Sequence, residues 1–152
     1  MQIVPGLSSD DHADSPVTII AEEVTFQWID GGRIYLSRLG RHNADSFLQW
    51  EETFRITMDA WPTERLLCVL FDLRTQSFGF SLAEGTRLRS LVNDYLYIHS
   101  AVALIYPDTL RARAMVAPLT FIPAPDHQSY NYLTDYEMGL LWLQEQHARS
   151  AE

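Results

Sequence analysis

The chain has 152 residues, about the length of one ordinary domain, and 47% of them are hydrophobic. A chain of this size and composition can bury a substantial core, which excludes a fully disordered protein, a collagen and a small disulfide-stabilised scaffold. All 11 basic residues are arginine. Without lysine, the chain cannot provide a Schiff-base lysine or the lysine of a phosphate-binding loop.

Acidic residues outnumber basic ones by 20 to 11, which gives a formal net charge of -9. Because a negative chain is repelled by phosphates, the charge disfavours nucleic acid and an anionic membrane surface as partners. No apolar run is long enough to span a membrane, and the first residues lack the basic start and apolar stretch of a signal peptide. We therefore expect a cytoplasmic protein.

The first residues are rich in aspartate, serine, proline and glycine and carry no apolar stripe. This composition predicts a flexible acidic tail over residues 1–16, followed by a single domain over residues 17–148. Cys68 has no partner for an internal disulfide and lies within an apolar run, so we expect a buried, unreactive thiol.

The predicted domain begins with a β-hairpin. Residues 24–29 are β-branched and aromatic, Asp30-Gly31-Gly32 supplies a tight turn, and residues 33–39 return as a strand. Asn43 or Asp45 can cap the helix that follows. Its apolar residues recur at steps of three and four, as on one helical face: Phe47, Trp50, Phe54, Met58 and Trp61.

Strands and helices then alternate along the chain. Residues 66–73 form an apolar run typical of a central strand buried on both faces, and residues 101–106 form another. Between them Ser81 and Glu84 have the spacing of a capping box, which predicts a helix over residues 82–98. We expect the two strands to be adjacent and parallel, joined by a right-handed crossover.

The last third of the predicted domain is less regular. A short helix is expected from Thr109 onwards, a strand at residues 119–122 and a loop at residues 123–131. Thr134 and Glu137 resemble a second capping box, which opens the last helix. The element order predicts an α/β fold, a mixed sheet with an N-terminal hairpin and helices packed on it. The predicted core includes Trp50, Phe54, Leu67, Val69, Phe71, Leu91, Leu104 and Trp142.

The sequence lacks the common motifs of zinc sites and of serine hydrolases. The five histidines lie far apart, with no His-Glu-x-x-His pattern and no cysteine pair. The segment Gly79 to Ala83 lacks the final glycine of a nucleophile elbow. We therefore predict no catalytic residue, no metal ligand and no cofactor.

The most informative segment spans residues 69–85. A predicted buried strand ends at Asp72, and a polar loop carries Thr75 and Ser77 to the helix start at Ser81. The free N–H groups and the dipole of a helix start favour an anionic group such as a phosphate. The simpler alternative is that Ser81 caps the helix while Thr75 and Ser77 satisfy the loop backbone. The candidate binding residues are Asp72, Thr75, Ser77 and Ser81.

Three features of this order resemble a known family. They are the apolar strand 67–73 that includes Asp72-Leu73, the helix that begins near Ser81, and the closing segment 133–143, an acidic turn followed by a helix with Trp142-Leu143. Together they resemble the STAS domain, the fold of bacterial anti-sigma-factor antagonists. The resemblance is closer to the SpoIIAA-like group of small bacterial proteins, and it covers roughly residues 20–146.

The resemblance implies a regulatory role. STAS domains that act in sigma-factor control carry Asp-Ser-Ser-Gly where the loop meets the helix, and a partner kinase phosphorylates one of these serines. Aligned from Asp72, that motif falls on Phe80-Ser81-Leu82-Ala83, where only Ser81 keeps a hydroxyl.

Two functional hypotheses follow. The favoured one is a non-enzymatic regulatory or binding module of the SpoIIAA-like type. It would present the loop 74–81 and the helix 82–98 to a protein partner, to a copy of itself, or to a small apolar, lipid-like ligand. The alternative is a small enzyme with a site assembled from distant residues such as Asp72, Asp94 and His99.

Overall fold

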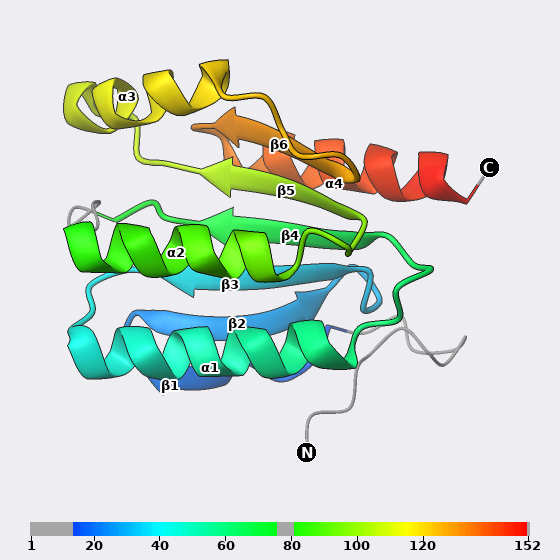
Figure 1. The fold of residues 1–152 in the computed structure, drawn as a ribbon, viewed down its shortest axis with the longest axis horizontal. Helices are drawn as coiled ribbons and strands as arrows, with labels where there is room; N and C mark the ends of the chain where they lie inside the picture. The colour runs from blue at the N-terminus through cyan, green and yellow to red at the C-terminus, as the bar shows by residue number, and fades with distance from the viewer. Residues whose placement is uncertain (1–13, 76–80, 152) are drawn as a thin grey trace.

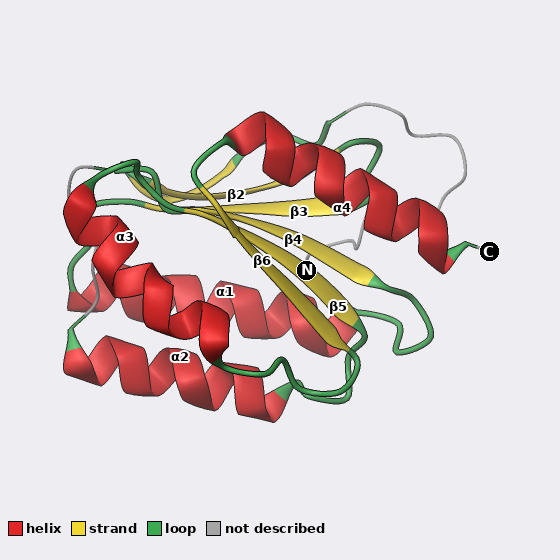
Figure 2. Ribbon diagram, turned by 90° about the horizontal axis from the view of Figure 1, so that it is seen from above, coloured by secondary structure: helices red, strands yellow, loops and turns green. Residues whose placement is uncertain are grey.

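The computed structural model describes residues 14–75 and 81–151. A six-stranded sheet, with its strands in chain order, carries helices on both faces (Figures 1 and 2). The strand pairs from the first strand to the third are antiparallel, and the pairs from the third strand to the sixth are parallel. The sheet is therefore mixed, as predicted. The elements are β1 (Thr18–Ala21), β2 (Val24–Ile29), β3 (Ile34–Leu39), α1 (Ala44–Ala60), β4 (Leu67–Asp72), α2 (Leu82–Asp94), β5 (Ser100–Ile105), α3 (Leu110–Val116), the 3-10 helix η1 (Ala117–Phe121), β6 (Gln128–Leu133) and α4 (Tyr136–Ser150).

The predicted hairpin is confirmed as β2 and β3, which pair from Val24 with Leu39 to Ile29 with Ile34. All three turn residues have positive φ, 55° at Asp30, 67° at Gly31 and 79° at Gly32, a conformation that aspartate and glycine tolerate best. The sequence analysis missed β1, a third antiparallel strand at the edge of the sheet.

The last residues of the predicted tail contact the sheet. The Ser15 N–H donates to the Trp28 carbonyl at 2.9 Å, and the Trp28 N–H donates to the Ser15 hydroxyl at 2.9 Å. Residues 1–13 lie outside the described part of the chain.

The two apolar runs are adjacent and parallel, as predicted: β4 pairs with β5 from Leu67 with Ser100 to Asp72 with Ile105. The helix between them is shorter than predicted. It ends at Asp94 rather than residue 98, because Tyr95 leaves the helical conformation, with φ -120° and ψ 27°. Ser81 and Glu84 form the predicted capping box at its start.

The strand predicted at residues 119–122 is wrong. Residues 117–121 form η1, with a proline in its first turn, where the missing proline N–H is not needed. The loop predicted at residues 123–131 is also partly wrong, because β6 begins at Gln128. His127, with φ 72°, turns the chain into β6, and its carbonyl accepts the Ser100 N–H of β5.

The short helix was predicted correctly and is α3, capped by Thr109. The capping residue of α4 was predicted wrongly. Asp135, rather than Thr134, accepts the N–H groups of Glu137 and Met138. A carboxylate suits this position because it favours the positive end of the helix dipole.

The two faces of the sheet bury different side chains. α1 and α2 cover one face, whose cluster is rich in aromatic residues, and α4 covers the other, whose cluster is mainly aliphatic (Figure 2). Cys68 lies in the second cluster, fully buried as predicted, and burial raises the pKa of its thiol to about 12. Of the predicted core, Trp50, Leu67, Val69 and Leu91 are buried, whereas Phe54, Phe71, Leu104 and Trp142 are partly buried.

Within the described residues, no helix combines the length and the hydrophobicity needed to cross a membrane.

Candidate functional site

The strands β3 and β4 end, and the helices α1 and α2 begin, at one edge of the sheet, on the left of Figure 1. Two hollows open at this edge. The first, of about 310 Å³, is here called the Asp72 hollow, and its lining includes Glu23, Arg38, Gly40, Asp72, Arg74 and Thr75. The second, of about 500 Å³, is called the Ser81 hollow, and its lining includes Arg41, His42, Phe47, Ser81, Glu84 and Arg87.

The structure divides the predicted binding residues between these hollows. Asp72 and Thr75 line the first, and Ser81 lines the second. Ser77 lies outside the described residues.

Asp72 is a buried carboxylate held by two arginines. Its Oδ1 accepts the Arg74 backbone N–H at 3.1 Å and Nε at 3.0 Å, while Oδ2 accepts Nη2 of Arg74 at 3.1 Å and Nε of Arg38 at 3.4 Å. Arg38 reaches it because the parallel register places Arg38 of β3 beside Asp72 of β4.

These contacts decide the charge of Asp72. Burial alone would raise the pKa of its carboxyl, but the hydrogen bonds from Arg74 and the positive charges of Arg74 and Arg38 outweigh burial and lower the pKa. The Arg74 guanidinium also lies over the Tyr136 ring, 4.9 Å from its centroid, at the start of α4. Asp72 is therefore ionised at neutral pH, and both of its oxygens already accept hydrogen bonds.

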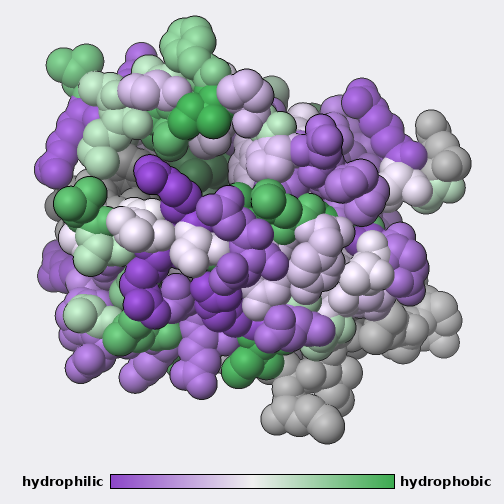
Figure 3. Space-filling model, in the orientation of Figure 1, coloured by the Kyte–Doolittle hydropathy of each residue, from purple (hydrophilic) through white to green (hydrophobic). Residues whose placement is uncertain are grey.

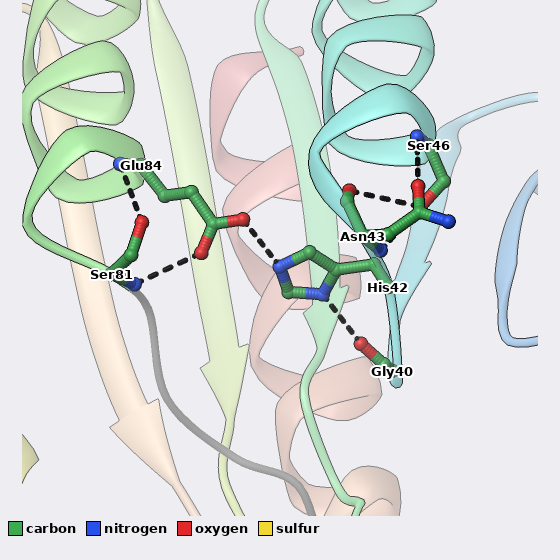
Figure 4. A network of polar contacts seen from close by, with 6 residues as sticks. All are labelled: Gly40, His42, Asn43, Ser46, Ser81 and Glu84. Atoms are coloured by element: carbon green, nitrogen blue, oxygen red, sulfur yellow. Dashed lines mark hydrogen bonds and ion pairs between the residues drawn. The ribbon is translucent and has the colours of Figure 1, made fainter.

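The Ser81 hollow holds a chain of polar contacts that links two helix starts (Figure 4). The Ser81 hydroxyl accepts the Glu84 N–H at 3.1 Å, and Oε1 of Glu84 accepts the Ser81 N–H at 2.9 Å. The other Glu84 oxygen lies 2.7 Å from Nε2 of His42, and Nδ1 of His42 lies 2.7 Å from the Gly40 carbonyl oxygen.

The start of α1 borders the same hollow. Asn43 accepts the Ser46 N–H at 2.9 Å, and the Ser46 hydroxyl accepts the Asn43 N–H at 2.9 Å. The prediction that Asn43 or Asp45 caps this helix is confirmed for Asn43. Two capped helix starts, two arginines and the Glu84 carboxylate surround the hollow, while Phe47 adds an apolar wall.

Gly40 connects the two hollows. A Cβ at this position would lie 2.8 Å from the Glu23 Cβ and 2.9 Å from the Thr75 Cγ2, closer than real Cβ atoms approach other atoms. Gly40 also donates its N–H to the Glu23 carbonyl at 2.8 Å, and its own carbonyl receives His42. Only glycine fits between the β1–β2 turn, which carries Glu23, and the segment after β4, which carries Thr75.

Sequence reasoning missed Arg38, Gly40, Arg74 and His42. One signal in the sequence could have indicated Gly40 and His42. Residues 40–43 connect a predicted strand to a predicted helix, and residues 74–81 make the same kind of connection. Two such connections lie at the same edge of a parallel sheet, so they are expected to meet.

The residues of the enzymatic alternative do not converge. The Leu67 N–H donates to the His99 carbonyl, which places His99 at the beginning of β4, whereas Asp72 ends that strand, roughly 17 Å further along. Asp94 pairs with Arg55 of α1 at 2.7 Å. Among the described residues, no three histidine, cysteine or acidic side chains are grouped so that they could hold a metal ion.

Comparison with known proteins supports the fold. No protein-family model and no curated protein matches the sequence. Among solved structures, the chain is similar to an uncharacterised protein of the DUF3478 family with a SpoIIAA-like fold from Shewanella loihica PV-4. The two share 17% sequence identity with a TM-score of 0.51, over 91% of this chain and 99% of that one. The resemblance drawn from the sequence is therefore confirmed for the architecture: the chain has a SpoIIAA-like fold.

Proposed function

We propose that this chain is a non-enzymatic regulatory or binding module that engages a protein partner through α2 and the Ser81 hollow. One observation carries the proposal. Leu82, the first residue of α2, is 90% exposed and lies between Ser81 and Ala83, which both line the hollow. The exposed Leu82 side chain extends the apolar lining of the hollow, and a continuous apolar surface of this kind supports a contact with a partner.

The remainder of α2 supports the same surface. Val92 is 38% exposed and, at 3.6 residues per turn, lies on the same half of the helix as Leu82. Arg89 between them is also exposed. An outer face that mixes apolar and basic side chains suits a partner segment with apolar and acidic residues.

A small apolar ligand is the second candidate, favoured by a different surface. Figure 3 shows hydrophobic residues gathered at the upper left, over α3 and η1. Leu110 is 86% exposed there, Phe121 85% and Ile122 65%. This patch belongs to α3 and η1 rather than to α2, which the resemblance made part of the binding surface.

Two matched variants test the proposal. Leu82 and Leu110 are each the first residue of a helix, each follows a capping residue, and each is almost fully exposed. Partners are captured from native cells by cross-linking to wild type, Leu82→Arg and Leu110→Arg, after melting curves have shown that all three are folded. We expect Leu82→Arg to lose the captured partner and Leu110→Arg to retain it. Capture that survives in Leu82→Arg and fails in Leu110→Arg would contradict the proposal and favour the α3 and η1 patch.

A further inference from the structure

In the described part of the chain, β1 and β6 are the edge strands of the sheet, and they differ. Proteins usually protect an edge strand with a bulge, charges, proline or short length, because its unpaired N–H and C=O groups can bind another strand. β1 covers four residues, its register with β2 shifts between Ile19 and Ala21, and two glutamates follow it. β6 covers six residues, pairs with β5 in continuous register and contains no charge and no proline.

The register with β5 decides which backbone groups of β6 face outward. The Ser100 N–H donates to the His127 carbonyl, and the Tyr106 N–H donates to the Leu133 carbonyl, both at 2.9 Å. In a parallel pair this pattern alternates along the strand. The odd-numbered residues of β6 therefore direct their backbone groups to β5, and the even-numbered residues direct theirs away from the sheet.

Tyr130 and Tyr132 are the central outward residues of β6. The N–H of Gln128, the first outward residue, donates to the Pro125 carbonyl at 3.1 Å, whereas no described residue accepts the outward N–H of either tyrosine. Figure 2 looks onto this edge from above and shows β6 between α3 and α4, with neither helix crossing it. The outer edge of β6 is therefore open to another strand.

The side chains of β6 suit pairing with an identical strand. The rings of Tyr130 and Tyr132 stack with their centroids 6.5 Å apart, and the Tyr130 hydroxyl contacts Oε1 of Gln128. Hydroxyl and amide groups both donate and accept hydrogen bonds, so each can pair with its own kind. Residues 128–134 contain no acidic residue and no arginine, although the chain has a net charge of -9. Two copies of this stretch can pair without placing like charges opposite each other.

A second copy can join this edge around a two-fold axis perpendicular to the sheet, which makes the two β6 strands antiparallel. Such an axis keeps α4 of both copies on one side of the joined sheet and the other helices on the opposite side. α3 and η1 lie beside β6 in both ribbon views, and they carry the exposed Leu110, Phe121 and Ile122 (Figures 1 and 2). The largest exposed apolar side chains of this region are therefore close to the seam between the copies.

We propose that two copies of this chain join their β6 strands in antiparallel orientation and form a dimer with one continuous sheet. The N–H groups of Tyr130 and Tyr132 donate to carbonyl groups of the second copy, and each of these bonds occurs twice by symmetry. The dimer does not rest on the proposed function, which uses the start of α2. Partner capture and dimer formation can therefore each fail without the other.

A proline substitution tests the role of the edge. Tyr130→Pro removes an outward N–H and leaves every N–H that donates to β5, so β6 can keep its place in the sheet. Tyr130→Ala removes the same ring but keeps the N–H, which makes it the matched control. Melting curves first show that both variants are folded. Sedimentation then measures the mass of wild type and both variants from about 1 to about 500 micromolar, a range that spans moderate to weak affinities.

We expect wild type to pass from monomer to dimer over this range and to form nothing larger, because a two-fold interface is closed. Tyr130→Pro should have a dimer dissociation constant at least about tenfold above that of Tyr130→Ala, since the same N–H is lost from both copies. A wild-type protein that stays monomeric would overturn the proposal. Equal association of the two variants would overturn it as well, because the dimer would then use another surface.

Single cysteines test the antiparallel arrangement without relying on the proline variant. A residue meets its own counterpart only near the axis, which lies near Tyr130 or Asn131 if both outward tyrosine N–H groups donate across the seam. The two copies of Gln128 are then roughly 13 Å or more apart, too far for a disulfide. Cys68 is fully buried, which keeps the native thiol out of the reaction.

On mild oxidation, we expect Tyr130→Cys or Asn131→Cys to give a cross-linked dimer and Gln128→Cys to stay monomeric. Cross-linking is read from gels run without reductant. A scan in which neither Tyr130→Cys nor Asn131→Cys cross-links more than Gln128→Cys would contradict antiparallel pairing of the two β6 strands.

Discussion

The Asp72 and Ser81 hollows lie at the same edge of the sheet and share the Gly40 segment, but they hold charge in different ways. In the first, two guanidinium groups surround one carboxylate, and the parallel register of β3 and β4 fixes their positions. In the second, a carboxylate closes a helix cap with one oxygen and meets an imidazole with the other.

The difference lies in what each carboxylate holds together. Asp72 connects two neighbouring strands and, through Arg74, the start of α4. Glu84 connects the first turn of α2, where the proposed partner surface begins, to the segment between β3 and α1.

The largest effect is expected from Asp72→Ala. The substitution leaves two guanidinium groups and the Arg74 N–H without their shared acceptor. The free energy of unfolding should fall by about 2–3 kcal/mol, below the full cost of breaking a buried pair because both arginines are partly exposed. Urea unfolding measures it.

Asp108→Ala is the matched control, since Asp108 and Arg113 form an exposed ion pair. Its removal should change stability by less than about 1 kcal/mol. Equal losses in the two variants would show that Asp72 is an ordinary surface charge.

The Asp72 contribution should also disappear in acid. The pKa of Asp72 is lowered in the folded protein, so its stabilisation is fully present above the unfolded value of about 4 and is lost as the pH falls through the folded value. We expect the stability difference between wild type and Asp72→Ala to be constant from neutral pH to about pH 5, and to shrink below about pH 4. A difference that grows in acid would have the wrong sign for a carboxyl with a lowered pKa.

Gly40→Ala should affect both hollows at once. The added methyl group meets Glu23 and Thr75 at distances that force the two loops apart. A loss of about 1–3 kcal/mol is expected, as for other overpacked positions. Gly85→Ala is a suitable control, because nothing lies within 4 Å of a Cβ there. If Gly40→Ala and Gly85→Ala unfold at the same temperature, the tight approach at Gly40 is refuted.

The smallest effects are expected at the two capping residues. Ser81→Ala and Asn43→Ala should each cost about 0.5–2 kcal/mol, because each removes the acceptor for one N–H of a first helical turn. Ser81→Asp should keep the cap, since aspartate caps as well as serine does. Thermal melts of wild type and the three variants check this. If Ser81→Ala melts at the wild-type temperature, Ser81 is not a cap.

Local signals in the sequence predicted much of the fold. The turn at residues 30–32, the two apolar strands and the Ser81 capping box each involve residues close in sequence, where conformational preferences are strong. β6 was missed because it is polar and follows two prolines, so its pairing with β5 decides its structure. The strand predicted at residues 119–122 failed for the converse reason, because apolar residues alone do not distinguish a strand from a short helix.

The site was harder to predict than the fold. Asp72 and Ser81 stand out as the end of a strand and the start of a helix, but their partners are distant in sequence. His42 and Glu84 are 42 residues apart, and Arg38 and Asp72 are 34 apart. Such pairs depend on strand register and on how two connections pack, which a single sequence does not reveal.

One set of nuclear magnetic resonance spectra compares the two hollows directly. The Arg74 amide reports on the Asp72 hollow, because it donates to Asp72, and the Glu84 and Gly85 amides report on the first turn of α2. Spectra are recorded for wild type, Asp72→Ala and Ser81→Ala. We predict that Asp72→Ala moves the Arg74 signal and leaves the Glu84 and Gly85 signals in place, and that Ser81→Ala does the reverse. If each variant moves all three signals alike, the division of this edge into two separately held hollows is contradicted.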